Sequence, residues 1–68
     1  MVNLEEERLN RGLSQREAAK NAGVAASVWG RAEAGETLRP ANAKAIADFL
    51  GVRVTDIWPI DAQEAAAA

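Results

Sequence analysis

Apolar residues recur along the chain at spacings of three and four positions, which is the period of an amphipathic helix. This pattern predicts a compact all-α domain of four to five helices. The expected helices lie over about residues 3–11, 15–22, 26–34, 41–50 and 56–58. The expected inward-facing residues include Leu4, Leu9, Ala18, Ala19, Trp29, Ala32, Ala43, Ile46, Ala47 and Leu50.

Capping residues mark where the second and third helices begin and end. Ser14 is a favourable N-cap, and Glu17 three residues later completes a capping box. Gly23 follows the second helix and Gly35 the third, where a left-handed backbone costs glycine little. Ala25 is a poor N-cap for the third helix. Two short helices joined by a tight turn predict a helix-turn-helix.

Residues 4–58 resemble the lambda-repressor-like (Xre/Cro) class of helix-turn-helix domains, which includes phage repressors, Cro proteins and related bacterial regulators. Each matching piece is short, and it is their order and spacing that make the resemblance specific. The matching pieces are Leu13 to Gln15, Ala19, Gly23-Val24, Arg31 to Gly35, Thr37 to Pro40 and Ile46 to Val52. The resemblance implies sequence-specific binding of double-stranded DNA by a transcriptional regulator of the repressor or Cro type.

The resemblance also implies that the third helix enters the major groove. Its outward face offers Ala26, Ser27 and Gly30, and Ala26 and Val28 could contact thymine methyl groups. Ser27 could bond a base or a phosphate. Arg31 is the one long donor there and the best candidate for a guanine contact, with a phosphate contact as the alternative. Because the usual polar reader is replaced by Ala26, no amide-to-adenine contact is expected at that position.

Other expected DNA contacts position the protein rather than read the sequence. Gln15 matches a position that binds phosphate at the start of the second helix, and Arg16 lies beside it on the outer face. Thr37 and Arg39 follow the third helix, and Asn42 opens the fourth. Where some relatives carry a second basic residue after the proline, this chain has alanine.

An ion pair between Arg8 and Glu33 is expected from the resemblance. It would tie the first helix to the end of the third and would be partly buried. A surface pair of no energetic consequence is the alternative, because exposed ion pairs contribute little to stability.

Composition argues against an enzyme. The 68 residues contain no cysteine and no histidine, so no Ser/His/Asp or Cys/His group and no thiolate metal site can be assembled. We expect no cofactor, no metal and no small-molecule ligand. Apolar stretches are interrupted by charge every few residues, which predicts no membrane segment and a cytoplasmic, nucleoid-associated protein.

The net charge of −2 is unfavourable for a DNA-binding protein, but the charges are unevenly distributed. Residues 8–31 carry five basic side chains against Glu17 alone, a net charge of +4, whereas residues 1–7 and 32–68 carry −3 each. The basic segment is the helix-turn-helix itself. Ordinary solvated charges remain the alternative explanation.

The end of the chain leaves two questions open. Trp58 and Ile60 either complete the monomer core or form a two-fold interface, and a homodimer would bind a palindromic operator. Residues 1–60 are taken as the domain, and the alanine-rich tail 61–68 is expected to fray. Alternative functions are a protein-binding adaptor or antitoxin-like module, or a phage excision accessory protein.

Overall fold

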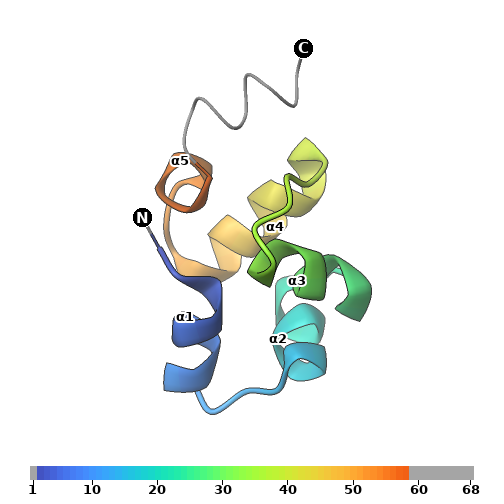
Figure 1. Ribbon diagram of the computed structural model, residues 1–68, viewed down its shortest axis with the longest axis vertical. Coiled ribbons are helices and arrows are strands. Elements are labelled where there is room, and N and C mark those ends of the chain that lie inside the picture. The colour runs from blue at the N-terminus through green and yellow to red at the C-terminus, as the bar shows by residue number, and fades with distance from the viewer. Residues whose placement is uncertain (1, 59–68) are drawn as a thin grey trace.

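The computed structural model describes residues 2–58, and all the regular structure in that range is helical. The helices are α1 (Leu4–Asn10), α2 (Gln15–Ala22), α3 (Ala26–Glu33), α4 (Pro40–Leu50) and α5 (Val54–Ile57). Figure 1 shows α2 and α3 on one side and α1 and α5 on the other, with α4 crossing between them. The predicted all-α fold is therefore confirmed. Ile60 and the tail lie outside the described residues.

Local chemistry sets the bounds of α2. The Ser14 hydroxyl accepts a hydrogen bond from the Glu17 backbone N–H, and the Glu17 carboxylate accepts one from the Ser14 N–H, completing the predicted capping box. Gly23 ends the helix with φ of 82°, and Gly51 ends α4 in the same left-handed conformation. A residue with a side chain would be strained at either position.

The core forms where the helices cross. Trp29 and Ile46 are fully buried at its centre, and the small residues Ala18, Ala19 and Ala47 let the helices approach closely. The Phe49 ring packs edge-on against Trp29, with ring centroids 6.0 Å apart. The two elements of the helix-turn-helix, α2 and α3, share the most extensive helix–helix contact.

Two expectations about the first helix and the fifth are wrong. Leu9 was expected in the core but is 58% exposed. It lies five residues after Leu4, which places it about 140° away around a helix whose inward face Leu4 defines. The fifth helix begins at Val54 rather than at residue 56, because the Asp56 carboxylate accepts a hydrogen bond from the Arg53 backbone N–H and so caps the helix at Arg53.

Candidate nucleic-acid interface

The outward face of α3 is built from small side chains and one long cation. Ala26, Ser27 and Arg31 are exposed and Gly30 is half-buried, whereas Trp29 and Ala32 point into the core. Within residues 2–58 the Arg31 guanidinium makes no hydrogen bond or ion pair, so it is available to an external acceptor. The exposed side chains that α3 itself contributes to this face are small, apart from Arg31.

Val28 has to be removed from the expected DNA contacts. Its side chain is 8% exposed and belongs to the core cluster, since it lies one helical turn before Ala32 on the same face. A buried methyl group cannot meet a thymine methyl without opening the core. Ala26 is the remaining candidate for that contact on α3.

A network of hydrogen bonds centred on Glu33 joins three helices. Arg8 Nε lies 2.6 Å from Glu33 Oε2, and Arg8 also donates to the backbone carbonyl of Leu13. Gln15 Nε2 donates to Glu33 Oε1 over 3.1 Å, and Trp29 Nε1 donates to Glu33 Oε2. The Arg8 and Glu33 side chains are only 13% and 7% exposed, so this is a largely buried ion pair and not a surface one.

The Glu33 carboxyl stays ionised in this setting. Burial acts to raise its pKa, but hydrogen bonds from Arg8, Gln15 and Trp29, together with the Arg8 charge, lower the pKa below its ordinary value. The same bond to Glu33 raises the pKa of Arg8. Glu33 therefore acts only as an acceptor at neutral pH.

These shifts predict how the stability of the domain depends on pH. Hydrogen bonds within the two caps, from Ser14 and Arg53, lower the pKa of Glu17 and of Asp56, as the network lowers that of Glu33. Carboxyls with lowered pKa values contribute stability above their unfolded pKa of about 4, and this is lost as pH falls through the folded values. Thermal unfolding should give a constant midpoint from pH 7 to about 5 and a falling one below about 4. A midpoint that rises on acidification would contradict this assignment.

Gly30 is not required by the fold. Its φ is negative, and an added Cβ would meet the Gln15 Oε1 atom at 3.9 Å, an ordinary contact. We expect Gly30→Ala to raise the free energy of unfolding by up to about 1 kcal/mol, the difference in helix propensity. Gly23→Ala is the control and should destabilise, because φ is +82° there. Urea denaturation of both variants measures the difference, and a destabilised Gly30→Ala would show that the glycine has a packing role.

The expected phosphate-contacting residues occupy two separate places. Gln15 and Arg16 are exposed at the start of α2, and the Gln15 side chain reaches across to α3. Thr37 and Arg39 are exposed on the segment between α3 and α4, and Asn42 is half-buried in the first turn of α4. One group of residues precedes α3 in the sequence and the other follows it.

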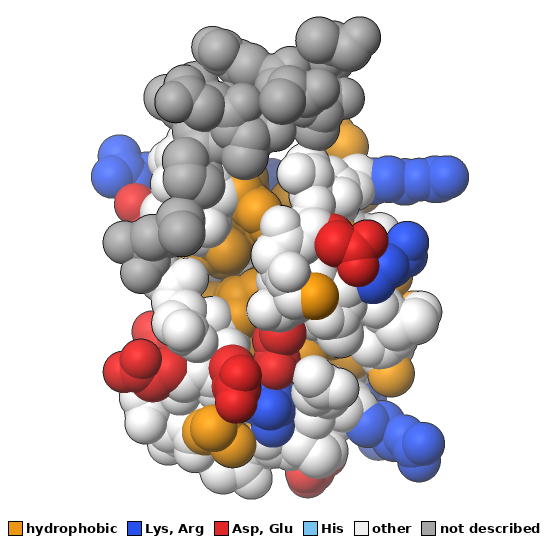
Figure 2. Space-filling view, in the orientation of Figure 1, with side chains coloured by type: hydrophobic (Ala, Val, Ile, Leu, Met, Phe, Trp, Pro, Cys, Tyr) orange, Lys and Arg blue, Asp and Glu red, His pale blue; other side chains and the backbone are white. Residues whose placement is uncertain are grey.

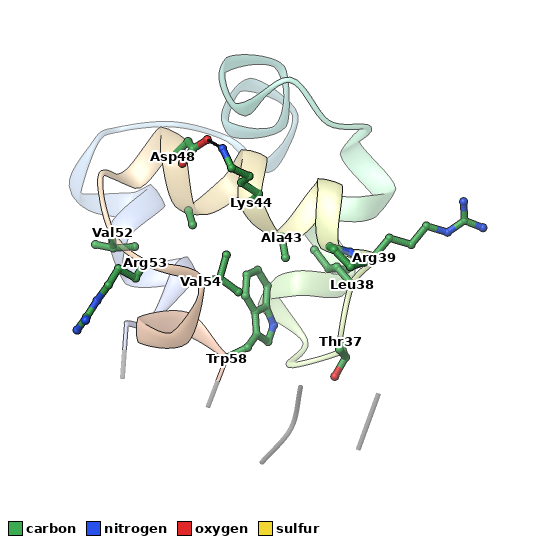
Figure 3. Close-up of a pocket in the computed structure, with 12 residues that line it drawn as sticks. Thr37, Leu38, Arg39, Ala43, Lys44, Asp48, Val52, Arg53, Val54 and Trp58 are labelled. Carbon is green, nitrogen blue, oxygen red and sulfur yellow. Dashed lines mark hydrogen bonds and ion pairs between the residues drawn. The ribbon is translucent and has the colours of Figure 1, made fainter. Parts of the chain in front are cut away.

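A groove separates α4 and α5 and has a volume of about 960 Å³. Leu38, Ala43, Val54 and Trp58 contribute apolar lining, and Figure 3 shows the Arg39 side chain extending away from the cavity. Trp58 is 5% exposed and part of the core, which favours the first of its two expected roles. Sequence reasoning did not find this groove, because its lining comes from separate segments.

The comparison with known families decides what kind of domain this is. A family model described as helix-turn-helix matches residues 4–57. The chain belongs to the lambda-repressor-like helix-turn-helix family. No curated protein and no solved structure matches the chain significantly. Lambda-repressor-like helix-turn-helix domains are a DNA-binding family of transcription regulation and not a family of enzymes.

Two further observations concern other kinds of site. Within residues 2–58, acidic side chains do not gather into a group that could hold a metal ion. None of the helices in that part of the chain is long and apolar enough to cross a membrane.

Proposed function

We propose that this protein is a transcriptional regulator that occupies a specific operator in double-stranded DNA, with α3 in the major groove. The observation that carries the proposal is the outward face of α3, where Arg31 is exposed with no partner within residues 2–58. Small neighbours, Ala26, Ser27 and Gly30, let the helix approach the base edges closely. Arg31 then reads guanine, the commonest specific contact in the major groove.

Charge distribution supports the same orientation. Figure 2 shows acidic side chains gathered over α1, whereas most of the basic side chains in this view project from the side that carries α2 to α4, where acidic atoms also lie beside them. The acidic first turn of α1 contains Glu5, Glu6 and Glu7, where the helix dipole favours negative charge. A duplex meeting α3 therefore approaches the basic side of an overall acidic molecule.

We further propose that two copies bind a palindromic site as a homodimer. Two-fold symmetric helix-turn-helix dimers set their recognition helices about 34 Å apart, one turn of DNA. Repressor or Cro-like action follows if operator occupancy blocks transcription.

Selection of bound duplexes from a random pool tests the proposal. We expect enrichment of a palindromic sequence that contains guanine, retained over random DNA at physiological salt. A salt titration of fluorescence anisotropy on that sequence should show a shallow dependence, since the domain offers few phosphate contacts. Absence of enrichment would contradict sequence-specific binding.

The groove also favours a second candidate function, binding of another protein. An adaptor or antitoxin-like module would use this apolar groove and leave the α3 face free. A stable stoichiometric complex with one purified protein, abolished by Val54→Asp in the groove and unaffected by Arg31→Ala, would support it. Retention of specific DNA binding by Val54→Asp would separate the two functions.

A further inference from the structure

The Gln15 side chain links the stabilising network of Glu33 to the proposed DNA surface. Gln15 is exposed at the start of α2, yet its Nε2 donates to Glu33 Oε1 on α3 over 3.1 Å. The opposite edge of the carboxamide lies over Gly30, with Oε1 3.9 Å from the position of a Cβ there. One side chain thus spans from the buried carboxylate to the outward face of α3.

The chemistry of Glu33 fixes which way this carboxamide is turned. An ionised carboxylate only accepts hydrogen bonds, so the NH₂ group of Gln15, and not its oxygen, must face Glu33. The carboxylate itself cannot swing away, because Arg8 and Trp29 hold both of its oxygens together with Gln15. One Nε2 proton is engaged by Glu33, and the second makes no hydrogen bond within residues 2–58.

We propose that Glu33 is a positioning residue for DNA binding, which turns the second Nε2 proton of Gln15 outward to a backbone phosphate. This inference rests on the proposed function. The ion pair between Glu33 and Arg8 joins two helices whichever way the Gln15 carboxamide is turned. Orienting Gln15 is therefore a second role of Glu33, separate from its ion pair.

Whether Glu33→Gln strengthens or weakens DNA binding separates this positioning role from simple electrostatics. Glu33→Gln removes a negative charge close to DNA, which by Coulomb attraction alone should strengthen binding. A neutral amide can present either its oxygen or its NH₂ to Gln15, so the carboxamide loses its single orientation. Positioning therefore predicts weaker binding, by about five-fold, as expected for one lost hydrogen bond. Gln15→Ala should cost a similar factor.

A double-mutant cycle measured by anisotropy on the selected duplex tests the proposal. All variants are compared at a temperature at which circular dichroism shows them folded. We expect the double variant Gln15→Ala/Glu33→Gln to bind no more weakly than either single variant, within about two-fold. Glu36→Gln controls for lost charge, because Glu36 is exposed and makes no contact with Gln15, and it should not weaken binding.

Each alternative outcome overturns a different statement. If Glu33→Gln binds as tightly as the wild type, or if the two losses multiply, Glu33 does not position Gln15 and this inference fails alone. If Gln15→Ala binds as tightly as the wild type, Gln15 makes no phosphate contact, and both that contact and this inference are wrong. If the wild-type chain binds no duplex, the proposed function itself is wrong, and the inference falls with it.

Discussion

Replacing Glu33 with alanine is expected to lower the free energy of unfolding by about 3 kcal/mol, the lower end of the range for breaking a buried ion pair. The loss arises because Arg8, which is 13% exposed, and the Trp29 indole N–H lose their shared acceptor. A 68-residue domain is stabilised by only roughly 3 to 10 kcal/mol, so a large part of its stability depends on this one carboxylate.

Thermal unfolding and urea denaturation of Glu33→Ala measure this effect. The midpoint of thermal unfolding should fall by about 12 to 24 °C. Glu36→Ala is a matched control, because it removes the same charge from an exposed position three residues further along the chain. Its effect should stay within about 0.5 kcal/mol. Equal effects of the two substitutions would show that the network around Glu33 contributes nothing beyond an ordinary surface charge.

Replacing Arg31 with alanine is expected to weaken binding to the selected duplex by about 10- to 100-fold. The loss should be much smaller on random DNA, because a bidentate contact with guanine is absent there. Arg31 is exposed on α3 and is the only long cationic side chain on that helix. The variant should therefore lose discrimination at one base pair of each half-site.

Anisotropy titrations of Arg31→Ala on selected and random duplexes check this prediction. Lys20→Ala is the control, since Lys20 is also an exposed cation but lies near the end of α2, outside the residues proposed to contact DNA and outside the groove. Its effect should be small and independent of sequence. A uniform loss on all duplexes with Arg31→Ala, together with a salt slope reduced by about one, would instead identify a phosphate contact.

Local signals in the sequence were sufficient to predict most helix boundaries. The capping box at Ser14 and Glu17 and the glycine at 23 act through neighbouring backbone groups, so their effect can be predicted without the rest of the chain. Leu9 was misplaced because α1 is short, and hydrophobicity alone did not reveal that Leu9 lies away from the face set by Leu4.

The centre of the candidate site could be predicted only in part. The hydrogen bond between Trp29 and Glu33 can be predicted from the sequence, since residues four apart lie on the same face of a helix. The contact between Gln15 and Glu33 could not be predicted from spacing, because it joins two helices through side chains 18 positions apart. Val28 was expected on the DNA face, but it is buried in the core, because its exposure depends on packing against the neighbouring helices and not on its position within α3 alone.

The most direct test of DNA binding through α3 is to map the bound surface by NMR, following backbone and side-chain amides as the selected duplex is added. The account predicts that the largest shifts fall on Gln15, Ser27, Gly30 and Arg31, with smaller ones at Thr37 and Arg39. Shifts confined to the groove residues Val52, Val54 and Trp58, with an unchanged α3, would contradict it.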